Sequence, residues 1–366
     1  MYDNDRELKR LLKLFIEATG PPGFEDPVRK ILTKEVSQYA DKIYTDTLGN
    51  LIFIKKGSNP NLPALMIMSH MDEIGMMVRF IDSNGFIRFS YLGGFIDQTT
   101  LGQRVLIHGS KDSIPGVIGP KSPHLMSPDE RKKSIPREQM FIDVGAASKG
   151  EVDALGIRIG DPITWIGPYL ELANNLICGK SLDNRIMIPM MIEVFKNAKP
   201  KNPLICIASV REEIGLQGAR TSTFSINLDH ELLLGISLDI ALAGDYPSVK
   251  KGKSPINLGK GPTITVAHGS SNSLQNGYII HPTVKKFLIK IAEKNKIPYQ
   301  FEIMEGGITD ATVITLTRCG IPTANIGIPT RYVHSPVAVT SLKDINNAIK
   351  LLKIIIDNLP DKFERS

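Results

Sequence analysis

The sequence predicts an α/β fold that is interrupted by a smaller, β-rich insertion. Short, continuous apolar runs at 64–68 and 204–208 are typical of strands covered on both faces, as in a parallel or mixed sheet. Segments with the apolar spacing of helices lie between such runs. Between 75 and 166, glycine and proline recur and short β-type runs alternate. We therefore expect an α/β domain formed by 1–74 and 167–366, with 75–166 inserted as a β-rich domain.

The sequence of the N-terminal part predicts one helix followed by two strands. Residues 7–17 place their large apolar side chains on one helical face: Leu8, Leu11, Leu12 and Phe15. The glycines and prolines of 20–23 end that helix. The apolar run at 51–54 predicts the first strand, and the run at 64–68 predicts the second.

The insertion begins with a hairpin signal. Two β-type runs, 78–81 and 86–89, flank the turn sequence Asp82-Ser83-Asn84-Gly85. The elements expected after it are strands at 103–107 and 116–119, an exposed polar loop at 121–138 and a short helix at 149–155.

The α/β pattern returns near residue 180. Strands are expected at 204–208, within 232–242 and from 321 onward, and helices at 184–197, 283–295, 310–318 and 342–358. Ser341 with Asp344 three residues later resembles a capping box that starts the last helix. Gly320 stands where a C-cap glycine would close the helix before it.

Composition excludes several classes of protein. A chain of 366 residues corresponds to about two domains, and 42% hydrophobic residues suffice for a large core. The net charge is 44 − 38 = +6. The basic clusters at 131–133 and 250–253 are short and contain no aromatic residues, which argues against nucleic-acid binding.

Cysteine usage and the N-terminus indicate a cytoplasmic protein. Cys178, Cys206 and Cys319 form no CxxC pair, which excludes a disulfide scaffold and a cysteine-built zinc finger. The first twenty residues begin with acidic side chains and have helix-spaced apolar positions, unlike a signal peptide. No run approaches the ~18 apolar residues that a membrane span needs.

Candidate ligand side chains follow several of the predicted strands. His70 and Asp72 come after the run at 64–68, where α/β proteins bind ligands in a crevice. A neutral imidazole binds zinc, and a nearby carboxylate orients it; the alternative is a loop histidine with a capping aspartate. Asp183 opens a predicted helix and is either its N-cap or a functional carboxylate.

The sharpest signal is the acid pair Glu212-Glu213 after the strand at 204–208. One carboxylate can bind a metal while its neighbour acts as general base; the alternative is a structural acid pair. Asp239 lies inside an apolar run, where a carboxylate is costly unless it is paired or metal-bound. His334 follows the strand that starts at 321.

Together these side chains suit a pair of zinc or cobalt ions that polarise a water and clamp a substrate carbonyl. The remaining histidines receive a structural interpretation: His108, His124, His230, His268 and His281.

Four segments resemble the tetrahedral (TET) aminopeptidases of metallopeptidase family 42, some of which were once labelled endoglucanases. They are His70-Met71-Asp72-Glu73-Ile74-Gly75, Leu182-Asp183-Asn184-Arg185, Arg211-Glu212-Glu213-Ile214-Gly215-Leu216 and Arg331-Tyr332-Val333-His334-Ser335-Pro336. The segment Gly306-Gly307-Ile308-Thr309-Asp310-Ala311 is similar to the family's glycine-rich loop. The similarity runs from about residue 7 to 358.

This resemblance implies a mixed-sheet zinc-peptidase (phosphorylase/hydrolase-like) catalytic domain with two divalent metal ions, zinc or cobalt and with manganese also tolerated. Asp183 would bridge the ions, with His70 and Asp239 on one and Glu213 and His334 on the other. Glu212 would be the general base, and Asp72 would support His70. The β-rich insertion would be a small barrel used for dimerisation, and dimers would assemble into a tetrahedral dodecamer.

The chain departs from the family pattern at a few positions. Asn184 stands where the family usually has a second aspartate, and Ile308 replaces a third glycine in the glycine-rich loop. The segment 267–271 is also less similar. These departures concern the shape and charge of the substrate pocket, so the substrate-binding residues stay unassigned.

We expect a cytoplasmic, metal-dependent aminopeptidase that acts on peptides. One alternative is a metal-independent glycoside hydrolase acting on β-glucan, but one tryptophan and 6% aromatic residues leave few surfaces for sugar stacking. The other alternative is a non-enzymatic oligomeric scaffold, for which Asn184 is the one supporting residue. The sequence does not indicate which N-terminal residue is preferred.

Overall fold

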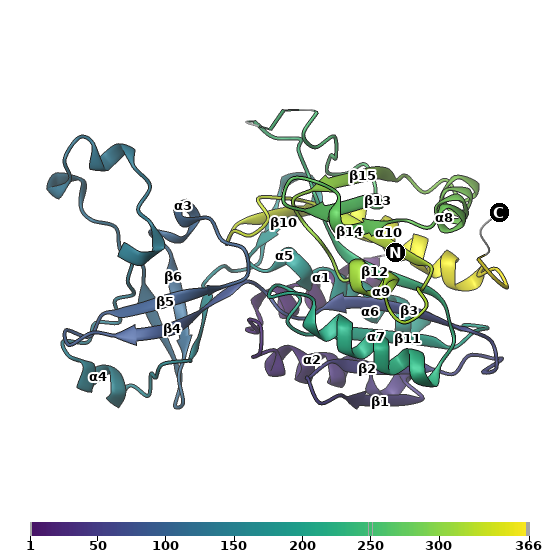
Figure 1. The fold of residues 1–366 in the computed structure, drawn as a ribbon, viewed down its shortest axis with the longest axis horizontal. Coiled ribbons are helices and arrows are strands. Elements are labelled where there is room, and N and C mark those ends of the chain that lie inside the picture. The colour runs from purple at the N-terminus through teal and green to yellow at the C-terminus, as the bar shows by residue number, and fades with distance from the viewer. Residues whose placement is uncertain (1, 248, 251, 364–366) are drawn as a thin grey trace.

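The protein folds as two units joined by a narrow connection (Figure 1). The computed structural model describes residues 2–247, 249–250 and 252–363. The larger unit is a mixed α/β structure around one large sheet, as the sequence predicts, and the smaller unit contains a second sheet. Among the described residues, no helix has the length and apolar content that crossing a membrane requires.

The large sheet has a parallel centre. Its main strand order is β1-β2-β11-β3-β12-β16-β17-β10-β9. Strands β11 (Leu204–Ser209), β3 (Ala64–His70), β12 (Leu232–Leu242) and β16 (Thr323–Arg331) are parallel neighbours. The flanking strands are β1 (Lys42–Thr45), β2 (Leu51–Lys55), β9 (Leu170–Leu172), β10 (Leu176–Gly179) and β17 (Ala338–Ser341). Three more strands branch from β16: β13 (Thr263–Ser270), β14 (Gln275–Ile279) and β15 (Gln300–Glu305).

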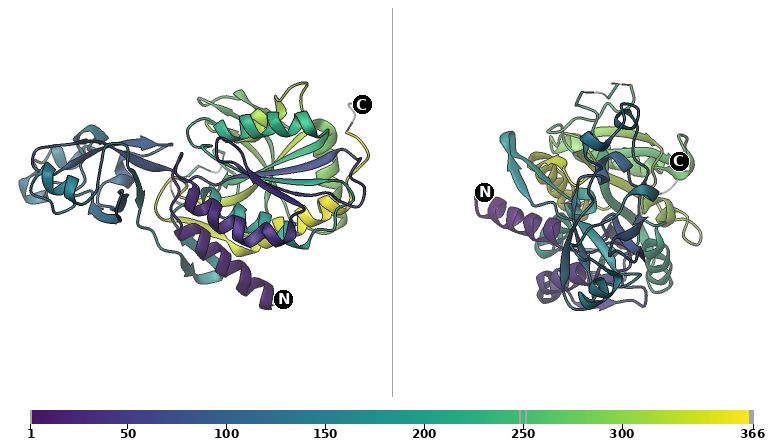
Figure 2. Two further views of the ribbon diagram at one scale, coloured as in Figure 1. Left: turned by 90° about the horizontal axis from the view of Figure 1, so that it is seen from below. Right: turned by 90° about the vertical axis from the view of Figure 1, so that its left-hand side faces the viewer.

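Helices cover both faces of this sheet (Figure 2). One face packs against α1 (Tyr2–Glu17), α2 (Asp26–Val36), α6 (Met187–Asn197), α8 (Pro282–Lys294) and α10 (Leu342–Asp357). The other face packs against α7 (Gln217–Asp229) and α9 (Ala311–Thr315). The central strands β3 and β11 are buried along their whole length. Two-sided covering explains why these strands are continuous apolar runs rather than alternating ones.

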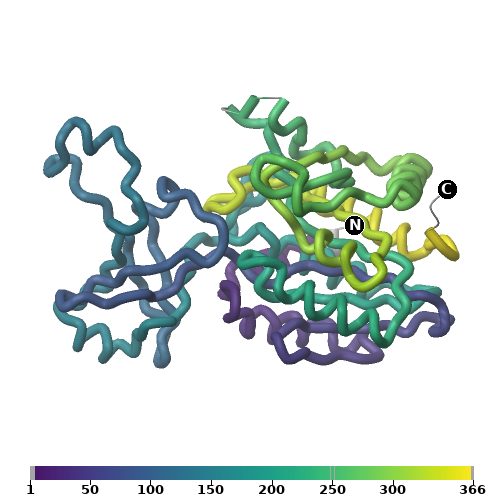
Figure 3. The backbone as a smooth tube through the Cα atoms, viewed as in Figure 1, coloured from purple at the N-terminus to yellow at the C-terminus, as the bar shows by residue number. Residues whose placement is uncertain are grey.

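The small sheet has the order β5-β4-β8-β6-β7 and its own apolar core. Its strands are β4 (Gly75–Ile81), β5 (Ile87–Leu92), β6 (Arg104–His108), β7 (Ser113–Val117) and β8 (Pro162–Trp165), with α3 (Asp97–Thr100) and α4 (Lys149–Ala154) beside them. Isolated bridges join Ile142 to β5 and Asp143 to β7, so one short segment links the two edge strands. The loop at 121–138 is largely exposed and extends away from the sheet (Figure 3).

Several local predictions differ from the structure. The helix expected at 310–318 is the short α9. Of the two hydrogen bonds that the predicted capping box at Ser341 requires, the one to the Asp344 side chain is absent. Ser341 accepts from the Lys343 N–H, but the Asp344 carboxylate accepts from the N–H groups of Gly259 and Gly261. Asp344 therefore fixes a distant loop instead of capping its own helix.

Candidate metal centre

The predicted ligand residues that follow or end the parallel strands lie at one edge of the large sheet. His70 ends β3, Glu212 and Glu213 follow β11, and Asp239 lies near the carboxyl end of β12. His334 follows β16. Because the carboxyl ends of parallel strands meet at the same edge, these side chains converge there.

Asp183 completes the cluster from the short helix α5 (Leu182–Arg185), in the segment between β10 and α6. It lies inside the first turn, and Ser181 holds the N-cap position. The peptide bond between Asp183 and Asn184 is cis. Helix α5 contacts β12 and β3, and this contact brings the Asp183 carboxylate to the strand ends.

The Asp183 carboxylate lies between two histidines. Its Oδ1 is 3.2 Å from His70 Nε2, and its Oδ2 is 3.4 Å from His334 Nε2. His334 Nε2 is also 3.4 Å from Glu213 Oε1. Two ligand groups share this carboxylate: His70, Asp183 and Asp239 form one, and Asp183, Glu213 and His334 form the other. Within each group, one donor atom per residue lies within 4.8 Å of the others.

The hydrogen bonding of His70 favours a cation at this point. His70 Nδ1 is 3.1 Å from the Asp72 carbonyl oxygen, which can only accept, so we assign the proton to Nδ1. A protonated Nε2 would donate to the Asp183 oxygen 3.2 Å away, whereas in the neutral form its lone pair faces that oxygen and a bound cation would hold the two acceptors together. Tetrahedral zinc with ligand bonds of 2.0–2.1 Å separates its ligands by about 3.3 Å. The donor set and its spacing therefore fit a divalent metal.

Electrostatics supports the same conclusion. Burial and the neighbouring acids raise the pKa of Glu212 and of Asp239, while His70 opposes this shift. Burial raises the pKa of Asp183, but the two histidines outweigh it and hold that pKa below its usual range. Asp183 Oδ1 and Glu213 Oε1 are buried and have no hydrogen-bond partner among the described residues. Divalent cations would relieve this concentration of buried negative charge.

Asp72 binds the backbone of the acid pair. Its Oδ1 accepts from the Glu212 N–H and its Oδ2 from the Glu213 N–H, both at 3.0 Å. The side chain is fully buried, and Oδ1 lies 3.5 Å from His70 Nδ1. Sequence reasoning linked Asp72 to His70 alone and missed its contacts with the Glu212–Glu213 turn.

Asn184 has a structural role beside the ligand cluster. Its Nδ2 donates a 2.7 Å hydrogen bond to the carbonyl oxygen of Leu238, the residue before Asp239. A carboxylate at this position has no proton to donate and would face the carbonyl oxygen. The departure from the family pattern thus ties α5 to β12 beside the ligand cluster.

A buried ion cluster adjoins the site and was also missed. Lys180 Nζ lies 2.6 Å from Glu73 Oε2, and Arg185 Nη2 lies 3.7 Å from Glu73 Oε1. Arg185 also donates to the carbonyl oxygens of Phe15, Ala18 and Gly20. These contacts attach the end of α1 and the following turn to the segment that carries Asp183.

We expect Lys180→Met to lower the free energy of unfolding by about 3–5 kcal/mol, because it leaves Glu73 buried beside one more distant cation. Lys9→Met is the matched control. Lys9 and Glu171 are also 2.6 Å apart, but their side chains are 34% and 51% exposed, against 5% and 3% for Lys180 and Glu73. Lys9→Met should lower the free energy of unfolding by about 1 kcal/mol or less. Denaturant unfolding of both variants measures the difference, and equal costs would contradict the prediction.

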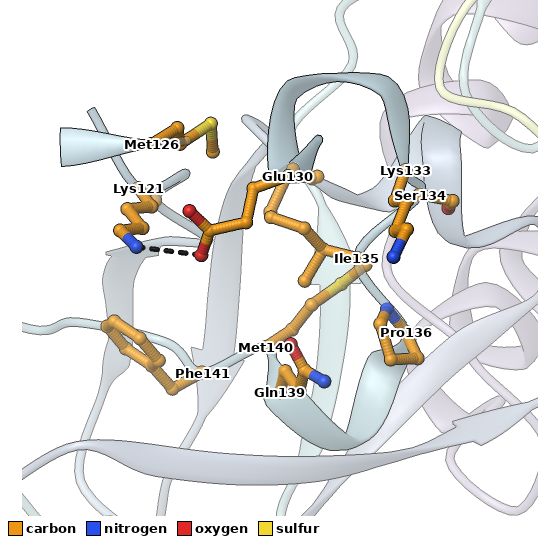
Figure 4. A pocket seen from close by; sticks show the side chains of 12 residues that line it. Lys121, Met126, Glu130, Lys133, Ser134, Ile135, Pro136, Gln139, Met140 and Phe141 are labelled. Atoms are coloured by element: carbon orange, nitrogen blue, oxygen red, sulfur yellow. Dashed lines mark hydrogen bonds and ion pairs between the residues drawn. The ribbon is translucent and has the colours of Figure 1, made fainter. Parts of the chain in front are cut away.

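A separate pocket of about 470 Å³ lies in the small unit, away from the ligand cluster (Figure 4). Leu101, Met126, Ile135 and Met140 give it an apolar wall, and Lys121 pairs with Glu130 beside it. None of the candidate ligands lines this pocket. It therefore does not belong to the candidate metal centre.

Comparison with known proteins identifies the family. The family model described as M42 glutamyl aminopeptidase matches residues 49–351. A putative aminopeptidase of Acetivibrio thermocellus is 38% identical over 349 residues, covering 95% of this chain and 98% of that protein. Aminopeptidase APDkam598 of the archaeon Desulfurococcus kamchatkensis superimposes with a TM-score of 0.91 at 36% identity, over 97% of this chain and 96% of that one. The TET1 peptidase of Pyrococcus horikoshii, which can assemble into a tetrahedron or a large octahedral shell, superimposes with a TM-score of 0.83 at 28% identity, over 95% and 99% of the chains. The chain therefore belongs to the M42 glutamyl aminopeptidase family.

Proposed function

We propose that this protein is an aminopeptidase whose site holds two divalent metal ions. His70 and Asp239 would hold one ion, Glu213 and His334 the other, and Asp183 both. One observation carries this proposal: the two Asp183 oxygens lie 3.2 Å and 3.4 Å from the Nε2 atoms of two different histidines. Imidazole and carboxylate ligands accept zinc, cobalt and manganese, with zinc or cobalt favoured here. Such ions, when bound, polarise a substrate carbonyl and lower the pKa of water.

Glu212 is the proposed general base. Its Oε2 is 3.9 Å from His70 Nε2, so its carboxylate borders the ligand cluster. Burial raises the pKa of Glu212 above its usual value, which improves a carboxylate as a proton acceptor near neutral pH. Glu212 would take the proton of the attacking water and pass it to the leaving amine. Asp72 fixes the backbone of Glu212 and so orients this base.

A free amino terminus would be held at the same sheet edge. Asp183, Glu212, Glu213 and Asp239 place four carboxylates there, and two divalent ions would offset their charge. The α-amine of a substrate would be anchored by one of the ions or by one of the acids, which an acetylated terminus would not allow. This anchoring supports removal of N-terminal residues over cleavage within a chain.

The rival functions receive less support. A glycoside hydrolase needs two carboxylates that flank the scissile bond at about 5–9.5 Å. Here Glu213 and Asp183 face histidines instead, which that chemistry does not require. A scaffold without activity has no need to bury this set of acids at a cost in stability.

We further propose that residues 75–166 form an inserted domain through which the chain dimerises, and that dimers build a tetrahedral dodecamer. The small unit exposes several large apolar side chains: Phe80, Ile96, Val117, Leu125 and Ile159. Burial of such side chains between subunits would stabilise an assembly. All three cysteines are free, which agrees with the proposed cytoplasmic location.

The test is hydrolysis of aminoacyl-p-nitroanilides with Glu, Asp, Leu or Lys, and of their N-acetylated forms. We expect release from the free-amine substrates, loss of release with a chelator, and recovery with Zn²⁺ or Co²⁺. The most rapidly cleaved substrate would identify the preferred N-terminal residue. Activity on carboxymethyl-cellulose that survives the chelator would support the glycoside hydrolase instead. Failure to bind any divalent metal would support the scaffold.

A further inference from the structure

We propose that Glu25 is a positioning residue for Glu212, an inference that rests on the proposed function. Glu25 lies in the turn between α1 and α2, and its side chain belongs to no ligand group of the metal centre. It is 3% exposed, so substrate does not reach it. Its role follows from the backbone atoms that it binds.

Two buried acids hold three consecutive N–H groups of the turn after β11. Glu25 Oε1 accepts from the Arg211 N–H at 3.1 Å. Asp72 accepts from the next two, those of Glu212 and Glu213, at 3.0 Å each. The amide before, that of Val210, donates to Asn50 Oδ1 at 3.0 Å. The backbone that carries the proposed base is thus fixed residue by residue by side chains from elsewhere in the chain.

This turn needs such support because of its conformation. Arg211 has φ +55°, in the left-handed region that residues other than glycine rarely adopt. A strained residue of this kind persists only when its surroundings hold it in place. The Glu25 carboxylate also accepts from the Gly23 N–H at 2.8 Å, which fixes the carboxylate itself. Glu25 therefore connects the turn after α1 to the residue directly before Glu212.

Removal of the Glu25 carboxylate leaves the partly buried Arg211 N–H without its hydrogen-bond acceptor. The turn would then relax toward a more common backbone conformation and displace the Glu212 side chain. A displacement of about 1 Å in a reacting group can cost about 10²-fold in rate. Substrate binding depends on other groups, so the effect should appear in kcat and leave KM almost unchanged.

The experiment compares Glu25→Ala with Glu25→Gln, which keeps an oxygen acceptor of the same length. With metal-loaded enzyme we expect kcat to fall about 10- to 100-fold in Glu25→Ala and to recover in Glu25→Gln, at similar KM and metal content. Glu25→Asp, which withdraws the acceptor by one methylene, provides the same test if the alanine variant does not fold. Asp344→Ala is the matched control, because Asp344 is also buried and also accepts from two backbone N–H groups, those of Gly259 and Gly261. It should lose stability but keep kcat.

A double variant separates this inference from the proposed function. If Glu25 acts through Glu212, then adding Glu25→Ala to Glu212→Gln should lower kcat no further than about twofold. A further loss equal to that of Glu25→Ala alone would show a general structural effect and overturn the inference. Wild-type kcat in both Glu25→Ala and Glu25→Asp would overturn it as well. Full activity in metal-loaded Glu212→Gln would instead refute the assignment of the base in the proposed function.

Discussion

Glu212→Gln is expected to reduce kcat by about 10²–10⁴-fold while both metal ions stay bound. The amide has nearly the shape of the carboxylate but cannot accept the proton of the attacking water. The Glu212 N–H bond to Asp72 is a backbone contact and survives the substitution. The turn after β11 should therefore keep its conformation, and the loss should reflect the missing base alone.

The neighbouring acid provides the contrast. Glu213 Oε1 lies 3.4 Å from His334 Nε2, and the Glu213 N–H also binds Asp72. Glu213→Gln should therefore leave the backbone intact but weaken the second metal position. Elemental analysis after dialysis should find two ions per chain in Glu212→Gln and fewer in Glu213→Gln. Reduced metal content in Glu212→Gln, or undiminished turnover in its metal-loaded form, would contradict the assignment of the two acids.

The centre of the fold could be predicted because its strands are buried on both faces. The runs at β3 and β11 contain almost no polar residues before His70 and before Ser209, so each strand and its carboxyl end are visible in the sequence. Acids and histidines that follow such runs must lie at one edge of a parallel sheet. This reasoning depends on local pattern alone.

Elements held by tertiary contacts were missed. Helix α7 has few large apolar residues, and its buried positions include Gly218, Ala219 and Ser222. It packs so closely that a Cβ atom on Gly218 would lie 2.3 Å from Asn50 Oδ1 and 2.4 Å from the Val210 carbonyl oxygen. Close approach through small residues leaves no apolar stripe from which a helix can be predicted.

The contacts of Glu25 and Asp72 with the turn after β11 were missed for a related reason. Glu25 and the Arg211 N–H are 186 positions apart in sequence, and Asp72 and the Glu212 N–H are 140 apart. An acid that binds a backbone amide so far away leaves no spacing pattern. Asp344 shows the opposite error, because its local pattern predicted a cap while its carboxylate binds another loop.

Asp183→Ala is expected to abolish binding at both metal positions, because each of its oxygens faces a different histidine. His334→Ala removes a ligand from one group only and should leave His70, Asp183 and Asp239 able to bind an ion. The readout is thermal unfolding with and without Zn²⁺, which does not depend on activity. A ligand present at about 100 times its dissociation constant stabilises the folded state by about 2.7 kcal/mol.

The comparison of the three proteins tests whether one carboxylate is shared. Wild type should show the largest zinc-dependent rise in Tm, His334→Ala a smaller rise, and Asp183→Ala none. The metal-free Asp183→Ala protein should be less stable than metal-free wild type, because the substitution removes the carboxylate that pairs with His70 and His334, so each zinc-dependent rise is measured from that protein's own metal-free Tm. If Asp183→Ala retains the same zinc-dependent rise as His334→Ala, the two positions do not depend on a common carboxylate. The bridging role of Asp183 would then be refuted, whereas binding by His70 and Asp239 would stand.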